Sequence, residues 1–506
     1  MCKKTAVIIG GGIGGLFVGA FLSKEGYKVS VVEKNATIGG GLQTFRRFGE
    51  IFDTGMHVIG GMSPGGNIYK ICRYLGILDK ISVKEVDCNC TDEVYIASCK
   101  SKYKIAKGKD GLIESLSLYF PHQRIELENY VNAMISLTQE FDLFYLRKSN
   151  QLIFNHSEDF YLSADKFIAK YISDEQLRTV LSFQNLLYAG EEDTTPAFIH
   201  AIISILYLNG SKRFVGGTSQ FAEALGNIIK ENGGEIITGD GVATVFVENK
   251  KIKKCVTSSG KELEGDYFVS AIHPSRLLQL LDDNSIFTKA YRNRLNNIPC
   301  TYSALILNIK LKPNTIKYFN YTGHYFSNDK EVWKKPKDAT QWPNLCLYMT
   351  PPMVNQSTYA STMNIIAPMS WDEVKQWENT TTRNRGDDYV EWKNKKASIV
   401  INAMENVFPS LSKCIENIDV SSPLTLRDYY GVTEGALYGY KKDCKKLMES
   451  RVTTKTKVSN LFLTGQSLNI HGFCGVALTA IETCDMILGK NQVLSSINGL
   501  KPNRDE

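Results

Sequence analysis

The first 33 residues alternate between short apolar runs and a turn that is rich in glycine. Ala6–Ile9 is a β-branched apolar run, and after the glycines the helical pattern of Leu16–Lys24 leads into a second β-rich run, Tyr27–Val32. This order predicts strand, tight turn, helix and strand, which together form a βαβ unit. Gly26 stands where the C-terminus of a helix favours a residue with positive φ.

The same segment has the outline of a secretion signal, because Lys3 and Lys4 precede an apolar run from Ala6 to Leu22. Its glycines argue against that interpretation, since each costs a helix about 1 kcal/mol relative to alanine. No cleavage site of small residues follows the run. The segment therefore favours a nucleotide site.

The turn itself carries a dinucleotide fingerprint. Gly10, Gly12 and Gly15 satisfy G-x-G-x-x-G, in which the glycines allow the bend, the approach of backbone to a pyrophosphate and the close packing of helix on strand. The helix N-terminus offers unpaired N–H groups to the phosphates. Glu33 ends the second strand, where a carboxylate accepts hydrogen bonds from ribose hydroxyls.

A second glycine cluster distinguishes FAD from NAD. The segment "EKNATIGGGLQTF" places Gly39, Gly40 and Gly41 shortly after the acid, with Thr44 behind them. An NAD site has no use for this cluster, whereas a cofactor that continues into a ribityl chain and a flavin meets backbone there. No second nucleotide fingerprint is present, so we expect no bound NAD(P)H beside the flavin.

These residues carry a family resemblance. The sequence resembles the FAD-dependent oxidoreductases of the amine oxidase and phytoene desaturase superfamily, whose N-terminal mark is this fingerprint plus a glycine doublet after the acid. That family usually has an arginine or lysine directly after the doublet, where this chain has Gly41. The stretch "FDTGMHVIGG", with Gly55 and His57, is similar to the retinol saturase and carotenoid isomerase branch.

Two later stretches extend the resemblance. The stretch from Arg213 to Pro274 resembles the family's middle segment, in which backbone near Val242 contacts the adenine. "NLFLTGQSLNIHGFCGVALTAIETCDMILG" resembles the C-terminal flavin segment, with a strand that ends at Thr464 and Gly465 and a helix from about Gly475. Many flavoproteins carry an acid where Gln466 stands, so the ribityl contact implied here is a neutral hydrogen bond.

The resemblance and the fingerprint together give a set of expected cofactor contacts. They are Gly10, Gly12, Ile13, Gly14, Gly15, Glu33, Lys34, Gly40, Gly41, Leu42, Thr44, Gly55, His57, Val242, Gly465, Gln466, Gly475 and Val476. His57 and His471 are the titratable groups in these motifs with an ordinary pKa near neutrality, so both are candidate proton shuttles, although a histidine is more often structural. The helix that follows His471 and Gly472 is expected to direct its positive dipole toward the flavin.

The order of the segments predicts an α/β fold with two discontinuous domains. A Rossmann-type FAD-binding domain takes residues 1–75, 211–275 and 455–492, and a substrate domain of a mixed sheet plus helices takes residues 76–210 and 276–454. Helical periodicity predicts a helix over Ile125–Lys148. Asp193 and Thr194 resemble the N-cap of a later helix, Ala197–Leu208.

Strand-like runs follow in the second half of the substrate domain. They are "TYSALILNIKL", "LCLYMTPP" and "STMNIIAPM", before a helix around Tyr389–Phe408. The earlier helix Ala197–Leu208 is apolar nearly all round, which is typical of a buried core helix, of a wall of a substrate channel or of a helix that dips into a membrane surface.

Composition narrows the class of protein. The chain has 506 residues, 43% of them hydrophobic, a formal charge of +6 that is spread along the chain and twelve cysteines without a C-x-x-C pair. We therefore expect a cytoplasmic protein with reduced thiols, no metal site, no nucleic-acid partner and no firm protein partner. Peripheral contact with a membrane stays open.

The resemblance implies FAD-dependent redox chemistry at carbon–carbon bonds of a hydrophobic isoprenoid or polyene, such as a carotenoid or retinoid, by hydride transfer to or from flavin N5. Desaturation, saturation and isomerisation stay open. The alternatives are a flavin amine oxidase or porphyrinogen oxidase, and, from another class, a non-catalytic escort protein that binds prenylated partners.

Overall fold

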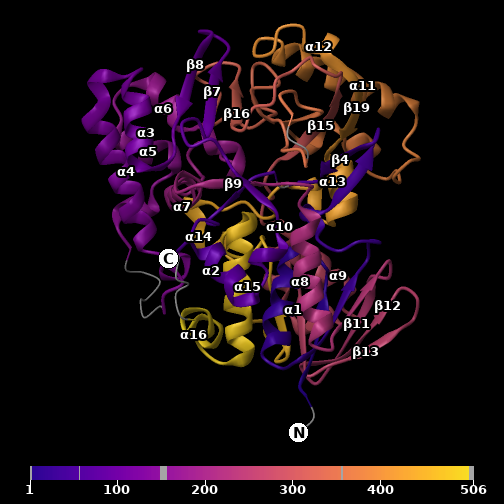
Figure 1. The fold of residues 1–506 in the computed structure, drawn as a ribbon. Helices are drawn as coiled ribbons and strands as arrows, with labels where there is room; N and C mark the ends of the chain where they lie inside the picture. Colours follow the sequence, from indigo (N-terminus) through magenta and orange to yellow (C-terminus); the bar gives the residue numbers. More distant parts are fainter. Residues whose placement is uncertain (1–2, 56, 149–155, 355–356, 501–506) are drawn as a thin grey trace.

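A computed structural model describes residues 3–55, 57–148, 156–354 and 357–500. Its first unit is a five-stranded parallel sheet in the lower half of Figure 1. In spatial order its strands are β10 (Glu235–Thr238), β2 (Lys28–Glu33), β1 (Thr5–Ile9), β14 (Tyr267–Ser270) and β20 (Leu461–Leu463). The sheet thus combines strands from the N-terminal, middle and C-terminal segments that were assigned to the nucleotide domain.

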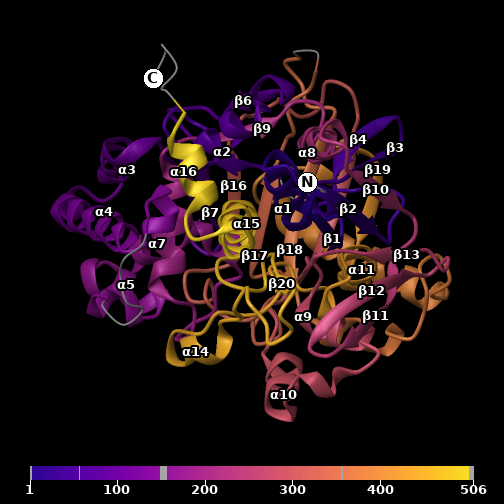
Figure 2. The ribbon, with the colours of Figure 1, turned by 90° about the horizontal axis from the view of Figure 1, so that it is seen from below.

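The alternation of side chains along β1 explains why both faces of this sheet are covered. Ala6 and Ile8 join the core under three helices, whereas Val7 and Ile9 join a second core on the opposite face. The three helices are α1 (Ile13–Lys24), α8 (Ser219–Glu231) and α15 (Gly472–Leu488). Seen from below, α15 lies beside α1 (Figure 2).

The opposite face carries a small antiparallel sheet and two helices (Figure 2). These elements are β11 (Val242–Glu248), β12 (Lys251–Thr257), β13 (Glu262–Glu264), α9 (Pro274–Leu280) and α10 (Lys289–Asn297). The α/β fold class with a Rossmann-like nucleotide domain is confirmed by this architecture and by the comparisons given below.

A seven-stranded mixed sheet forms the second unit, in the upper half of Figure 1. Its spatial order is β19 (Ile415–Ser421), β15 (Ser303–Leu311), β18 (Thr362–Met369), β17 (Leu345–Met349), β16 (Thr322–Phe326), β7 (Asp92–Ile96) and β8 (Ser101–Ile105). One face packs against α11 (Asp387–Met404), and the other joins the large core that it shares with the nucleotide domain. The second face is the one that bounds the functional cavity.

Helices and short strands fill the remaining space between and around these sheets. The helices are α2 (Asn67–Leu75), α3 (Gly108–Ser117), α4 (Arg124–Gln139), α5 (Ala164–Tyr171), α6 (Glu175–Leu181), α7 (Ala197–Leu208), α12 (Leu411–Cys414), α13 (Pro423–Tyr430), α14 (Leu447–Ser450) and α16 (Gln492–Asn498). The short strands are β3 (Thr44–Arg47), β4 (Glu50–Asp53), β5 (Ile59–Gly60), β6 (Val83–Glu85) and β9 (Ser211–Phe214).

Three predicted helix boundaries are wrong. The helix expected over Ile125–Lys148 ends at Gln139, because the chain turns to place Phe141 against the rings of Phe160 and Phe198. The helix expected from about Gly475 begins earlier, at Gly472, so its N-terminus lies at His471 and Gly472, as was also expected.

The third wrong boundary is the start of α7. Its N-cap residue is Pro196, and neither Asp193 nor Thr194 caps the helix. Asp193 instead has a φ of +59° and donates its backbone N–H to Asp165, so this segment is a turn that precedes the helix.

Helix α7 lies inside the protein. All of its residues except Tyr207 are buried, which contradicts the alternative of a helix at a membrane surface. Its side chains join the core, and Ile203, Leu206 and Tyr207 also line the main cavity. Helix α7 is therefore both a buried core helix and part of the cavity wall. Among the described residues no single helix can cross a bilayer by length and hydrophobicity, and only α15 with α16, bent by 118°, passes as a pair.

Candidate dinucleotide and substrate cavity

A cavity of about 470 Å³ runs between the two sheets. This volume lies within the roughly 300–1,000 Å³ that is typical of ligand pockets. At one end the glycine turn after β1 lines it, and at the other end it meets the apolar residues Ile203, Ile306, Leu347 and Ile366. The cavity therefore joins a polar, glycine-lined compartment to an apolar one.

Most of the predicted cofactor contacts line this cavity. They are Gly10, Gly12, Ile13, Gly14, Glu33, Lys34, Gly40, Gly41, Leu42, Gly55, His57, Val242, Gly465, Gln466 and Val476, and the candidate His471 lines it too. The structure thus brings together residues from all three segments of the nucleotide domain. Their contact with a cofactor stays a prediction.

Three predicted contacts do not line the cavity, and each has a packing role instead. A Cβ atom on Gly15 would lie 2.1 Å from the carbonyl oxygen of Gly10, and one on Gly475 would lie 2.3 Å from that of Ile470. Thr44 donates its hydroxyl to Ser219 at 3.2 Å. For these three residues the structure gives a structural reason in place of the predicted contact.

Gly12 has no such packing reason. A Cβ atom there would meet no atom within 4 Å, and the φ of Gly12 is −69°, which any residue adopts. The protein alone therefore has room for a side chain at Gly12, and this room belongs to the cavity. A glycine in that place fits a ligand whose pyrophosphate passes close to the backbone.

Two helix N-termini lie at the cavity without a capping side chain. Gly12 is the N-cap of α1 and His471 is the N-cap of α15, and neither makes a side-chain cap hydrogen bond. The first N–H groups of both helices thus stay available to acceptor atoms of a ligand. A Cβ on Gly14 would lie 3.3 Å from the Val476 side chain of α15, so the first turns of the two helices approach closely.

Glu33 is the predicted ribose partner and is 6% exposed. Its carboxylate accepts hydrogen bonds from the backbone N–H groups of Gly11, at 2.7 Å, and Asn35, at 2.8 Å. These bonds fix the side chain against the glycine turn at the cavity wall. Glu33 therefore shapes the turn besides facing the cavity.

The two candidate histidines are buried and neutral at pH 7. Burial, together with the nearby charge of Arg213, lowers the pKa of His57 to about 4, and burial lowers the pKa of His471 to about 3, with Lys442 acting in the same direction. The expectation that they titrate near neutrality is therefore wrong, because low dielectric surroundings penalise the imidazolium form.

Both rings nevertheless have unused hydrogen-bonding atoms. Neither ring nitrogen of His57 has a partner, and Nδ1 of His471 has none. The hydroxyl of Thr464, which also lines the cavity, lacks a partner as well. Buried polar atoms are nearly always hydrogen-bonded in folded proteins, so these atoms indicate a polar ligand in the cavity.

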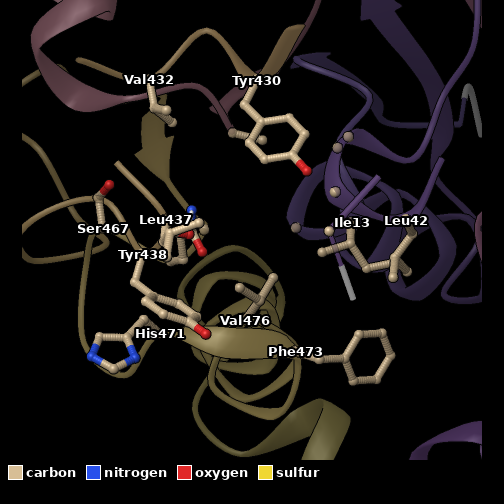
Figure 3. A pocket seen from close by; sticks show the side chains of 18 of the residues that line it. Ile13, Leu42, Tyr430, Val432, Leu437, Tyr438, Ser467, His471, Phe473 and Val476 are labelled. Atoms are coloured by element: carbon tan, nitrogen blue, oxygen red, sulfur yellow. Dashed lines mark hydrogen bonds between the residues drawn. The ribbon is translucent and has the colours of Figure 1, made fainter. Parts of the chain in front are cut away.

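Sequence reasoning missed a tyrosine-rich wall that comes from residues 428–440. Tyr430 and Tyr438 line the cavity, and the Tyr438 ring lies beside the His471 ring with centroids 5.1 Å apart (Figure 3). Tyr430 points toward Ile13 and Leu42. Their signal in the sequence is the two Tyr-Gly pairs, Tyr430–Gly431 and Tyr438–Gly439, which lie outside the three segments that resemble the family.

The segment around Tyr430 is tied to the nucleotide end of the cavity by three hydrogen bonds. Lys34 Nζ donates to the carbonyl oxygen of Asp428 at 2.7 Å, and the side chain of Asn35 donates to that of Tyr429 at 2.9 Å. The Tyr430 hydroxyl donates to the carbonyl oxygen of Thr54 at 2.7 Å. Residues 428–432 thus form a strap across the crevice.

The sequence of this chain is similar to a family model and to several known proteins. A family model described as an NAD(P)-binding Rossmann-like domain matches residues 8–75. The all-trans-retinol 13,14-reductase of Danio rerio is 24% identical over 536 residues, which cover 97% of this chain and 87% of the zebrafish protein. The chloroplastic prolycopene isomerase 2 of an Oncidium hybrid cultivar is 21% identical over 489 residues, 92% of this chain and 80% of the plant protein.

The chain is a relative of the retinol 13,14-reductases and prolycopene isomerases. This confirms the family resemblance that was inferred from the glycine motifs.

Solved structures agree on the fold. An oxidoreductase from Methanosarcina mazei has a TM-score of 0.63 at 17% identity and covers 95% of this chain and 100% of its own. Putrescine oxidase bound to putrescine has a TM-score of 0.62 at 12% identity, over 96% of this chain and 99% of its own. The predicted enzyme class, an oxidoreductase with the fold of FAD-dependent enzymes, is confirmed. The matched family model supports a dinucleotide site at the glycine turn.

Proposed function

We propose that this relative of the retinol reductases binds FAD and catalyses redox chemistry at carbon–carbon bonds of a hydrophobic isoprenoid or polyene. The observation that carries the proposal is the single cavity, which joins a glycine-lined dinucleotide compartment to an apolar chamber lined by Ile203, Ile306, Leu347 and Ile366. The activities for which the relatives are named, retinol reduction and prolycopene isomerisation, agree with an apolar chamber of this kind.

Bound FAD would supply the acceptance or donation of a hydride at its N5 atom. The chain's own residues would do the rest. The N-terminus of α1 and Gly12 would hold the pyrophosphate, and Glu33 would accept the ribose hydroxyls. The apolar wall would exclude water, which protects a transferred hydride from protons of the solvent.

The buried histidines would act as neutral hydrogen-bond partners. With a pKa of about 4, His57 would donate one N–H and accept one hydrogen bond at pH 7, and it would carry no charge into the apolar chamber. The backbone N–H groups at the N-terminus of α15 would stabilise negative charge on the cofactor, so this stabilisation needs no charged side chain.

The alternatives make different demands on the cavity. A flavin amine oxidase commonly has a lysine near the reacting atom, but the lysine among the described residues that line the cavity is Lys34, beside Glu33 at the nucleotide end. An escort protein without flavin has no need for the open position at Gly12. A polyene oxidoreductase therefore remains the better supported function.

The decisive experiment combines two readings on the purified protein. Lipids extracted from the folded protein are identified by mass spectrometry, and the holoenzyme is mixed with carotenoids, retinoids and putrescine while the flavin absorbance is followed by stopped flow. We expect a polyene to change the oxidation state of the flavin and putrescine to leave it unchanged. Reduction by amines without a response to any polyene would contradict the proposal, and a colourless protein that takes up no FAD would favour the escort protein.

A further inference from the structure

Lys442 is a buried cation just behind the cavity. It is 7% exposed, and its Nζ donates to the backbone carbonyl oxygens of Ser450, Ser467 and Leu468 at 3.1, 2.9 and 2.7 Å. An ammonium group has three donors, so all three are in use. The side chain is therefore held in one place.

The charge of Lys442 has no anionic partner. Among the described residues no ion pair joins it to a carboxylate, whereas the neighbouring Lys441 is paired with Glu191. Burial, with the nearby charge of Arg451, lowers the pKa of Lys442 to about 7. Because this pKa is close to 7, about half of the Lys442 side chains are neutral at pH 7, and a negative charge placed nearby would restore the ammonium form.

The three carbonyl contacts connect Lys442 to the wall of the cavity. Ser467 and Leu468 belong to the loop between β20 and α15, and Gly465, Gln466 and Ser467 of this loop line the cavity. A Cβ atom on Gly439 would lie 2.3 Å from the Ser467 hydroxyl oxygen, so the segment before Lys442 packs directly on this loop. The Nζ of Lys442 is therefore bonded directly to a loop that lines the cavity.

The charge of Lys442 also acts on groups in the cavity. It helps to lower the pKa values of His471 and His273, which both line the cavity. Arg451 and Glu482 also lie near this loop, and Asn469 bridges them by accepting from Arg451 and donating to Glu482. Among the described residues Glu482 thus interacts with Asn469, and the ammonium form of Lys442 has no ion-pair partner.

We propose that Lys442 is a positioning residue that holds one positive charge behind residues 465–468 and thereby favours the reduced, negatively charged form of the bound flavin. This inference rests on the proposed function. A hydride carries two electrons and one proton, so a neutral flavin that accepts it gains one negative charge. A fixed cation behind a thin wall of backbone stabilises this charge in a medium of low dielectric.

The test uses the FAD-loaded protein and sulfite, which adds to oxidised flavins and gives an anionic adduct. We expect Lys442→Met to bind sulfite about tenfold more weakly and to shift the midpoint potential of the flavin to a more negative value. Lys442→Arg, which keeps the charge, should stay close to the native protein. Lys446→Met is the matched control, because the Lys446 side chain is 64% exposed, and it should change neither reading.

The outcomes separate a charge effect from a structural one. A Lys442→Met protein that retains FAD with native sulfite affinity and native potential would overturn the proposal. Should Lys442→Met not fold, Lys442→Gln replaces it, because its neutral amide still offers two hydrogen-bond donors. Neutral variants that melt at the native temperature but retain no FAD would show that Lys442 only holds the loop in place through its hydrogen bonds. This result would also overturn the proposal. A native protein without FAD would instead refute the proposed function.

Discussion

The hydroxyl oxygen of Tyr430 lies 2.6 Å from the position that a Cβ atom on Gly55 would occupy. These residues are far apart in the sequence, and the tyrosine belongs to the strap over the crevice. The same hydroxyl donates to the carbonyl oxygen of Thr54 at 2.7 Å. Gly55 is therefore a glycine because the strap closes over it.

Gly55→Ala should loosen the strap, since the new methyl group displaces Tyr430. Overpacking of this kind costs about 1–3 kcal/mol. We expect a lower melting temperature and faster release of FAD, measured by the fluorescence of the freed flavin. Tyr430→Phe alone should cost about 1 kcal/mol through the lost hydrogen bond.

A double-mutant cycle checks the cause. The phenylalanine lacks the hydroxyl that clashes with the new Cβ atom, so Gly55→Ala should cost less in the Tyr430→Phe background than in the native protein. Additive losses in the double variant would show that the contact between Tyr430 and Gly55 is not the reason for the glycine.

Glu33→Gln should weaken dinucleotide binding, because the carboxylate accepts two backbone hydrogen bonds at the glycine turn and the amide replaces one acceptor by a donor. Hydrogen bonds to charged groups contribute about 1.5–3 kcal/mol, so the dissociation constant of FAD should rise by about 10- to 100-fold. Titration of the apoprotein with FAD measures it. Glu231→Gln on the exposed end of α8 is the control, and equal affinity of both variants would refute the role of Glu33.

The buried histidines predict loss of stability in acid. The ordinary histidine pKa is 6.5, and the folded protein lowers it to about 4 at His57 and about 3 at His471. Below pH 6.5 the unfolded chain therefore binds protons that the folded chain does not bind. Stability is full above pH 6.5 and falls as the pH approaches 4, by about 3 kcal/mol for the shift at His57.

The measurement is the melting temperature of the apoprotein between pH 8 and pH 4.5. His57→Phe with His471→Phe should reduce the slope in this range, while His122→Phe, which changes an exposed residue, should leave it intact. A native slope in the double variant would show that these two imidazoles do not control the acid response.

The apolar chamber predicts that a larger side chain blocks the substrate and spares the cofactor. Ile366 of β18 lines the cavity, whereas its neighbour Ile365 faces the core under α11 on the other side of the sheet. Ile366→Trp should lower kcat/KM for a polyene by about tenfold or more with an unchanged flavin spectrum. Ile365→Val should leave turnover near the native rate. Loss of flavin in the Ile366 variant would place the cofactor, and not the substrate, against this strand.

The sequence predicts the nucleotide domain well because local chemistry specifies it. The strand, the glycine turn, the helix and the acid all fall within the first 33 residues. Gly12 and Glu33 line the cavity, as expected. Gly15 was expected both to contact the cofactor and to let the helix lie close to the strand. The 2.1 Å approach of a Cβ atom on Gly15 to the Gly10 carbonyl oxygen supports the packing role.

The features that the sequence does not predict depend on contacts between residues that are far apart in the chain. Tyr430 lies at the cavity and Lys442 contacts a loop that lines it, because α13 and the following segment fold back over the nucleotide domain, and neither residue belongs to a local motif. The histidine pKa values depend on complete burial, which a residue's neighbours in sequence do not reveal. The early end of α4 likewise depends on the contact of Phe141 with the distant Phe198.

The most direct test of the account measures the nucleotide that native protein and Gly12→Val release on denaturation. A Cβ atom at Gly12 would meet no protein atom within 4 Å, so the variant should fold and melt like the native apoprotein. We expect one FAD per native chain by mass spectrometry and almost none in Gly12→Val, because the valine occupies the space of the pyrophosphate. A native chain that releases a nicotinamide nucleotide, or a Gly12→Val protein that binds FAD normally, would contradict the central claim.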